Sequence, residues 1–455
     1  MREISQKQFN AYCYARQPLL RVMSNEIKWY EAGNRKVLAT LILDKADQDY
    51  NFVILVRDAR RLFRAWNVSC SHPTIEDAEK ELAEKIDVLV NDGQDVYVQG
   101  DEVKPPHDIL SPVVDEANQH EYFRVLANEK RMEAARNLIV EAVYSYIDVD
   151  GNYIKEFQTH GFDARLWELF LYIFLYDAGF EFNQDYHAPD YMVSYYGNPF
   201  CIEAVTVNPS QNPDRPDPEP PQSDEEMQRL CDDYMPIKFG SSLFSKLQKR
   251  YWEKPHVQGK PLIIAIHDYH MPGSMSWSRN ALVEYLYGTR ARVREVDGQK
   301  TTYEEVISEH TWQGKTIPSN FFNTENAENI SAILFTNTAT ITKFNRMGKL
   351  AGLGGENIKM IRMGVRLHPD PNSLEPLRFA ADVDDPDYEE DWSESIIMYH
   401  NPNALIPVDL DCFNTINHMW VDPDTGELVG IQREGDILSS LTNVIVPVQD
   451  LQDEV

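Results

Sequence analysis

The sequence predicts an α/β protein with a mixed β-sheet at its centre; counted over the whole chain, the class is α+β. Three observations predict this class. A helix that is apolar on more than one face is expected from Asp163 to Ala178. Two β-type runs follow it, Asp190–Tyr196 and Phe200–Val207. A helical stretch then leads to the continuous apolar strand Pro261–His267, and a strand, a helix and a second strand in this order form a right-handed parallel crossover.

Hydropathy divides the 455 residues into three regions, which we take as candidate domains. Residues 1–100 have the pattern of a β-meander followed by an amphipathic helix, and predict a small α+β N-terminal module. Residues 113–290 contain one or two lead-in helices and the core described above. Residues 291–455 predict a C-terminal α/β extension with a buried strand near Ile330.

Composition narrows the class of protein. A hydrophobic share of 42% with 11% aromatic residues is ample for packed cores and excludes wholesale disorder. No apolar run approaches the roughly 18–20 residues of a membrane span, and the first residues lack the apolar region of a signal peptide. The five cysteines lie far apart without a CxxC pair. We therefore expect a cytoplasmic protein with no membrane contact and no structural zinc site.

The net charge of −30 opposes an encounter with nucleic acid, but the charge is unevenly distributed. A basic segment, residues 343–366, carries six basic residues against the single acid Glu356. An acidic segment, residues 382–394, carries eight acidic residues and no base. A basic face for nucleic acid and a separate acidic face would produce this pattern, and so would two solvated surfaces. The basic residues are Lys343, Arg346, Lys349, Lys359, Arg362 and Arg366.

Three carboxylates occupy positions where a core should be apolar. Glu168 lies within the predicted helix, Asp190 opens one strand and Glu203 lies inside the next. An unpaired buried charge is costly, so each needs a partner or a metal ion.

A turn centred between residues 197 and 198 would place Asp190 opposite Val205, with Glu203 one diagonal step away on the same face. Two carboxylates at that spacing can share one hard cation. The alternative is that Asp190 caps its strand and Glu203 pairs with an Arg or a Lys.

These residues resemble the PD-(D/E)XK nucleases of the restriction-endonuclease-like superfamily. The resemblance lies in Pro189-Asp190, a strand, a Glu inside the next strand and a Glu-bearing helix before them, and it covers roughly residues 157–270. It implies a restriction-endonuclease-like core that binds Mg²⁺ or Mn²⁺. It also implies that Asp190, Glu203 and the carbonyl of Ala204 are metal ligands and that Glu168 is an accessory acid. The phrases FDARLWELF and GKPLIIAIHDYH are similar to uncharacterised bacterial proteins, and this similarity suggests a role in defence against foreign DNA.

One position departs from the family pattern. The family carries a Lys two residues after the Glu, and Val205 occupies that place here. We expect a lysine on the following helix to replace it, with Lys246 preferred and Lys249 second. Such a lysine would balance the charge of the attacking hydroxide.

Three functions are consistent with the sequence. The preferred one is a Mg²⁺-dependent nuclease acting on DNA rather than RNA, most simply double-stranded DNA, with a homodimer or a partner protein as further options. Its expected nucleic-acid contacts are Lys249, Lys343, Arg346 and Lys349. The second is a binding or scaffold protein that has kept a nuclease-like core without catalysis, which the missing Lys and the acidity favour. The third is an enzyme of another class that uses the His267-Asp268-Tyr269-His270 neighbourhood.

Overall fold

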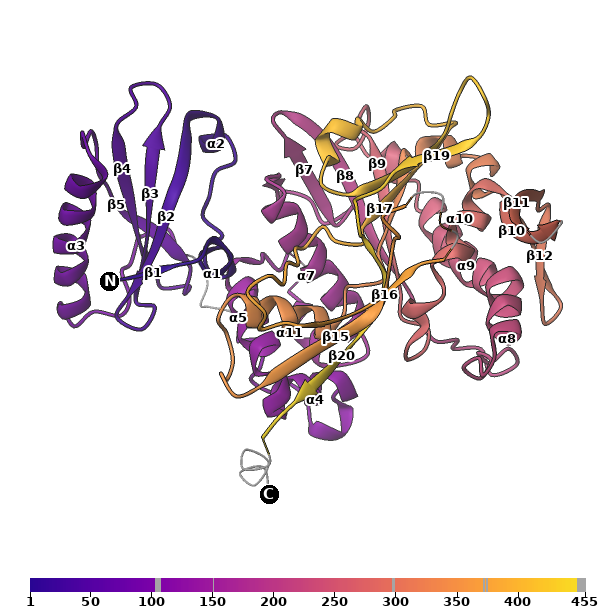
Figure 1. Cartoon of the computed structure of the whole chain (residues 1–455), viewed down its shortest axis with the longest axis horizontal. Helices are drawn as coiled ribbons and strands as arrows, with labels where there is room; N and C mark the ends of the chain where they lie inside the picture. The colour runs from indigo at the N-terminus through magenta and orange to yellow at the C-terminus, as the bar shows by residue number, and fades with distance from the viewer. Residues whose placement is uncertain (103–107, 150, 297–298, 371–372, 374, 448–455) are drawn as a thin grey trace.

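The computed structural model describes residues 1–102, 108–149, 151–296, 299–370, 373 and 375–447. Its two largest sheets have eight and five strands. The five-stranded sheet and its helix form the N-terminal module, which lies to one side of the eight-stranded central sheet (Figure 1). The predicted α/β class and the mixed sheet are confirmed. No helix in the described part of the chain is long and apolar enough to cross a membrane.

The N-terminal module is the predicted meander with one helix. Its strands pair in sequence order, each antiparallel to the next. Helix α3 begins after Thr74, whose hydroxyl accepts the Asp77 N–H, and it covers one face of the sheet. The elements are β1 (Arg2–Ile4), α1 (Gln6–Tyr12), α2 (Leu20–Met23), β2 (Ser24–Ala32), β3 (Val37–Asp44), β4 (Tyr50–Arg57), β5 (Phe63–Val68) and α3 (Ile75–Asn91).

The central sheet has the strand order β19-β18-β17-β14-β9-β8-β7-β6. Strands β6, β7 and β8 pair antiparallel, whereas β8 pairs parallel with β9 and β9 parallel with β14. The predicted parallel crossover is therefore present. The strands are β6 (Glu181–Asn183), β7 (Tyr191–Tyr195), β8 (Asn198–Val207), β9 (Leu262–Asp268), β14 (Ala332–Phe335), β17 (Ile397–His400), β18 (Asn417–Val421) and β19 (Leu428–Ile431).

Helices cover both faces of this sheet. Along β9, Ile263 and Ala265 pack toward α7, while Ile264 and Ile266 pack toward α9, as the two-residue period of a strand requires. Both layers are apolar, which explains why β9 is a continuous apolar run. One layer contains α5 (Glu133–Ser145), α7 (Phe162–Asp177) and α11 (Ile341–Leu350), and the other contains α9 (Met235–Leu247) and α10 (Arg279–Tyr287).

The predicted boundary at residue 290 does not separate two sheets. Strands β14, β17, β18 and β19 come from the last third of the chain and extend the central sheet beyond β9. The reason is that the apolar runs of β14 and β17 need cover on both faces, which the existing helix layers supply. The other elements are α4 (Glu121–Asn128), α6 (Tyr153–Gln158), α8 (Asp224–Arg229), the hairpins β10–β11 (Thr289–Val296, Gln299–Val306) and β12–β13 (Glu309–Trp312, Lys315–Pro318), and a sheet of β15 (Lys359–Arg366), β16 (Leu377–Asp382) and β20 (Ile437–Ile445).

Candidate active site

The hairpin of β7 and β8 sets the position of two of the three carboxylates. Its turn is Tyr196-Gly197, with φ of 45° and 87°, and Tyr195 pairs with Asn198. The predicted turn was thus one residue too late, because Asn198 already belongs to β8. The error moves the pairing by two residues, so the side chains keep their face. Continuing the observed register by one step places Asp190 opposite Glu203, which is closer than the predicted diagonal.

Glu203 is almost fully enclosed, with 4% of its surface exposed. Its Oε1 accepts a hydrogen bond from the Tyr251 hydroxyl at 2.6 Å and contacts Nζ of Lys246. Its Oε2 is buried and has no hydrogen-bond partner among the residues that the structure describes. Lys246 reaches Glu203 because Leu243 and Leu247 anchor α9 on the sheet and turn the lysine toward β8. The structure therefore brings together the Glu and the Lys that the sequence singled out.

Asp190 lies at the start of β7, with more than a third of its surface exposed. Its Oδ2 accepts the N–H of Ala204 at 2.7 Å. The pKa of Asp190 is raised to about 8, first by burial of the carboxyl and then by the negative charges of Glu203 and Glu168. Contact with solvent weakens the effect of burial on this pKa. Repulsion by the two neighbouring carboxylates raises the pKa as well.

Glu168 lies on α7 and is 9% exposed. Its Oε2 accepts a hydrogen bond from Arg165 at 2.6 Å, and Arg165 also donates to Glu156 at 2.6 Å. Burial raises the pKa of Glu168, and the Arg165 guanidinium opposes that rise. Glu168 and Asp190 line the same cavity, so the helix and the hairpin meet at one place.

This cavity has a volume of about 50 Å³, enough for a few water molecules. Sequence reasoning missed four of the side chains around the carboxylates: Tyr146, Arg165, Tyr191 and Tyr251. Two carried a usable signal, because Arg165 precedes Glu168 by three residues on one helix and Tyr251 continues the Leu243–Leu247 spacing. The cavity lining includes Tyr146, Asp148, Arg165, Glu168, Tyr186, Asp190 and Tyr191.

The donor atoms fit only one kind of metal site. Within the described ranges, no group of three or more His, Cys, Asp or Glu side chains could hold a metal ion. The hydrogen bonds above use one oxygen of each of Glu168, Asp190 and Glu203, and Oε2 of Glu203 is left buried and unpartnered. Mg²⁺ binds through one or two carboxylates and keeps several waters. The residues present fit such a cation held by Asp190 and Glu203, and they do not fit an all-protein cage.

The alternative expected from the sequence, a strand cap at Asp190 and an ion pair at Glu203, predicts the same contacts as a metal site. Asp190 accepts the backbone N–H of Ala204 on the neighbouring strand, and Glu203 pairs with Lys246. A purely structural ion pair is therefore consistent with this geometry as well.

The histidines at the end of β9 are enclosed. His267 is fully buried, and its Nε2 accepts the Ala339 N–H at 3.1 Å. Burial lowers the pKa of His267 to about 3. His270 lies 2.7 Å from Asp268 through Nδ1 and is 1% exposed. Neither histidine lines the cavity at Asp190.

The basic segment corrects one prediction. Lys343 and Arg346 are 0% and 3% exposed, and both bind Glu390, at 2.7 Å and 2.8 Å. Lys349 lies 3.2 Å from Asp384. The buried members of the basic and acidic segments thus neutralise each other inside the fold, and Lys343 and Arg346 have no surface to offer to phosphate.

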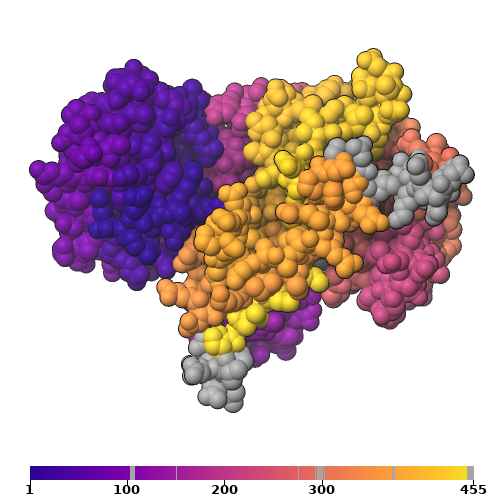
Figure 2. Space-filling model, viewed as in Figure 1, coloured from indigo at the N-terminus to yellow at the C-terminus, as the bar shows by residue number. Residues whose placement is uncertain are grey.

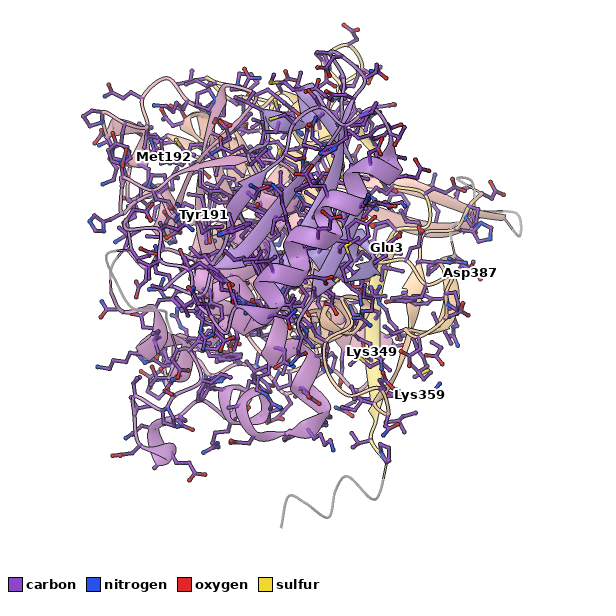
Figure 3. All side chains as sticks on the ribbon, turned by 90° about the vertical axis from the view of Figure 1, so that its left-hand side faces the viewer. Glu3, Tyr191, Met192, Lys349, Lys359 and Asp387 are labelled. Atoms are coloured by element: carbon purple, nitrogen blue, oxygen red, sulfur yellow. The ribbon has the colours of Figure 1, made fainter. Side chains whose placement is uncertain are left out.

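The position of the basic segment relative to the carboxylates also contradicts the prediction. Figure 3 shows Lys349 and Lys359 on the opposite side of the molecule from Tyr191, the neighbour of Asp190. The expectation that the basic segment lies on the same side as the carboxylates is therefore wrong. Composition could not reveal this, because the partners of these basic residues lie in the acidic segment, 23 to 47 positions further on.

A different basic region lies next to the carboxylates. Residues 246–260 contain five basic residues and one acid, Glu253, and begin at Lys246. Within it, His256 stacks on Tyr186 with ring centroids 3.9 Å apart and planes 8° apart, and contacts the Ala188 carbonyl at 2.9 Å. Tyr186 is 39% exposed and also lines the cavity. The basic residues are Lys246, Lys249, Arg250, Lys254 and Lys260, of which Lys249 and Arg250 are exposed.

Comparison with protein-family models, with curated proteins and with solved structures gives no match. What bears on function is therefore the chemistry of these side chains.

Proposed function

We propose that the protein is a metal-dependent nuclease that hydrolyses phosphodiester bonds. One observation carries the proposal: Glu203, buried on β8, has a lysine on one carboxylate oxygen and an orphaned second oxygen, beside Asp190 and Glu168. Structural ion pairs rarely leave a buried carboxylate oxygen without a partner. The element order from α7 to β9 (helix, three antiparallel strands, helix, parallel strand) also agrees with the order that the family resemblance implies.

Asp190, Glu203 and the carbonyl of Ala204 would hold a Mg²⁺ or Mn²⁺ ion. When bound, such an ion lowers the pKa of a coordinated water and neutralises charge on the phosphate. Lys246 takes the part of the cation missing at Val205 and offsets the negative charge that develops on the attacking oxygen. Tyr251 and Lys246 both bind Oε1 of Glu203, which would leave Oε2 available to the metal ion. Arg165 holds Glu168 against α7.

Nucleic acid, DNA before RNA, is the proposed substrate. Residues 246–260 supply the local positive charge that the rest of the acidic chain lacks, and Lys249 is the predicted contact within them. Tyr186, stacked on His256 at the edge of the cavity, adds an aromatic ring on which a base could stack. Double-stranded DNA is the first substrate to test. Its cleavage would agree with a role of the protein in defence against foreign DNA.

A second candidate is a binding or scaffold protein built on the same core. The observation that favours it is the closed contact between Lys246 and Glu203, which already neutralises one of the two ligands.

The test is plasmid cleavage by the purified protein in Mg²⁺ or Mn²⁺, beside Glu203→Ala, Lys246→Ala and the exposed control Lys80→Ala on α3. The proposal expects metal-dependent nicking that both site variants lose and the control retains. Nicking that survives Glu203→Ala rejects the site. Loss in Glu203→Ala alone keeps the nuclease and rejects the lysine. Absence of cleavage on every nucleic acid, together with absence of metal binding by calorimetry, supports the scaffold.

A further inference from the structure

A large cavity lies between the N-terminal module and the central region, away from the carboxylates. Its volume is about 1230 Å³, above the roughly 300–1000 Å³ usual for small-molecule sites. Figure 2 shows the module, in indigo, as a lobe beside the rest of the molecule. The cavity walls come from the sheet of the module, from α1, from the end of α7, and from α11 with Trp392.

The cavity exists because α3 covers one face of the module's sheet, whereas the central region covers the other face at one end only. Val37, Ala39 and Leu41 of β3 pack under α3, whereas the alternate residues Thr40 and Ile42 line the cavity. The residues Ile27, Val53, Leu55, Ala65 and Val68 continue that wall on the neighbouring strands. This face of the sheet is therefore largely apolar where it meets the cavity.

The module is attached at one end of this face. Arg57 forms two hydrogen bonds with Glu141 of α5, at 2.8 Å and 3.0 Å, and Phe63 belongs to the same hydrophobic core as α5 and α7. At the other end, α2 leaves apolar side chains in solvent: Leu20 is 55% exposed and Met23 is 63% exposed. The cavity thus has a closed end at Arg57 and an apolar rim at α2.

Eight charged side chains line the cavity, and most are neutralised within the protein. Arg16 binds Glu26 through two hydrogen bonds of 2.6 Å. Three more lining groups form ion pairs: Arg64 with Asp101, Glu390 with Arg346, and Asp391 with Arg433. Asp177 accepts a hydrogen bond from the neutral amide of Asn10 at 3.2 Å, which does not cancel its charge. Lys7 and Arg21 are exposed, and no ion pair to either is present in the described part of the chain. Lys7 and Arg21 against Asp177 leave one net positive charge among the lining side chains.

We propose that this cavity binds a small amphiphilic anion, with its apolar or aromatic body against the open sheet face and its acidic group toward Lys7 and Arg21. The apolar wall would bury the apolar body of the ligand, and the positive charges of Lys7 and Arg21 would attract a negatively charged head group. A mononucleotide and a fatty acid both have this chemistry. The proposal is independent of the proposed nuclease activity, because none of these residues belongs to the carboxylate site.

The test uses 8-anilinonaphthalene-1-sulfonate, an aromatic anion whose fluorescence rises in apolar sites, titrated into the full-length protein. Lys7→Glu combined with Arg21→Glu reverses the free charge, Ala65→Trp fills the cavity from an exposed position, and Lys80→Glu on α3 is the matched control. The proposal expects one site per chain, an affinity weakened by about tenfold or more in the first two variants, and no change in the control. All changes are on exposed residues, and unchanged thermal unfolding verifies that the variants fold.

Equal affinity in all variants would overturn the proposal, as would equally tight binding of the uncharged analogue N-phenyl-1-naphthylamine. Displacement of the probe by dodecanoate assigns an acyl ligand, and displacement by adenosine monophosphate assigns a nucleotide. Displacement by neither rejects this class of ligand.

Discussion

Removing the Lys246 amine should expose how strongly Glu203 depends on it. In Lys246→Met the Glu203 side chain, 5% exposed, keeps the Tyr251 hydrogen bond and loses its ion pair with Lys246. Breaking a fully buried ion pair costs about 3–5 kcal/mol. Because the Lys246 side chain is 23% exposed and one hydrogen bond survives, we expect a smaller loss, about 2–3 kcal/mol of unfolding free energy.

Two further measurements separate this charge effect from lost packing. Glu203→Gln in the Lys246→Met background should recover most of the loss, because a neutral amide does not need the cation. The loss should also be larger at pH 8 than at pH 5. The isolated carboxylate in the folded variant binds a proton more tightly than in the unfolded chain, and that stabilising proton is lost as the pH rises.

The assay is urea unfolding of the wild type, both single variants and the double variant, with EDTA present so that no metal contributes. Additive effects of the two substitutions would refute the reasoning, because they would mean that Lys246 and Glu203 do not interact. A pH-independent loss in Lys246→Met would refute it too, since only an ionisable partner produces the expected slope.

The remaining predictions concern other contacts. The stability of Glu168→Gln relative to the wild type should increase as the pH rises above the usual pKa range of a glutamate, because the raised pKa of Glu168 in the folded state means that its ionisation opposes folding. Urea midpoints of both proteins at pH 4 and pH 8 without metal test this. A difference that does not change with pH would contradict it. Glu390→Gln should destabilise the protein by about 3 kcal/mol or more, since Lys343, Arg346 and Arg362 all surround that carboxylate, while the exposed control Glu389→Gln should change little; thermal unfolding compares the two. Tyr186→Ala should weaken binding of a single-stranded oligonucleotide by about 1 kcal/mol or more in metal-free fluorescence anisotropy, and Tyr186→Phe should not; equal affinities would remove the stacking role.

The local hydrophobic pattern of the sequence predicted the segments whose structure depends on interactions within the segment. Helix α7 is displaced by a single residue from its predicted bounds, and β9 likewise, because continuous apolarity leaves few alternatives for either segment. The turn was misplaced because Tyr196 adopts a left-handed backbone, which a tyrosine does only when the hairpin around it demands it. Lys246 was identifiable because the leucines around it fix which way α9 faces.

The rest depends on contacts between distant segments. Arg346 and Glu390 look like members of two solvated surfaces until α11 and the acidic segment are brought together. The cavity next to the N-terminal module has walls from residues near 10, 40, 175, 350 and 390, so it is a product of docking and has no sequence signature. Arg165, by contrast, could have been found from its spacing to Glu168.

Helix α7 gives the molecule a mechanical property. Its 16 residues make a rod about 24 Å long, enclosed by apolar packing along most of its length. Arg165 and Glu168 lie near one end, at the carboxylates, whereas Tyr176 and Asp177 lie at the other, in the wall of the large cavity, where the Tyr176 hydroxyl accepts the N–H of Arg16 at 2.6 Å. Because an α-helix has a fixed rise of 1.5 Å per residue, Tyr176 and Arg165 are held about 16 Å apart along its axis, so α7 sets the spacing between the large cavity and the carboxylates.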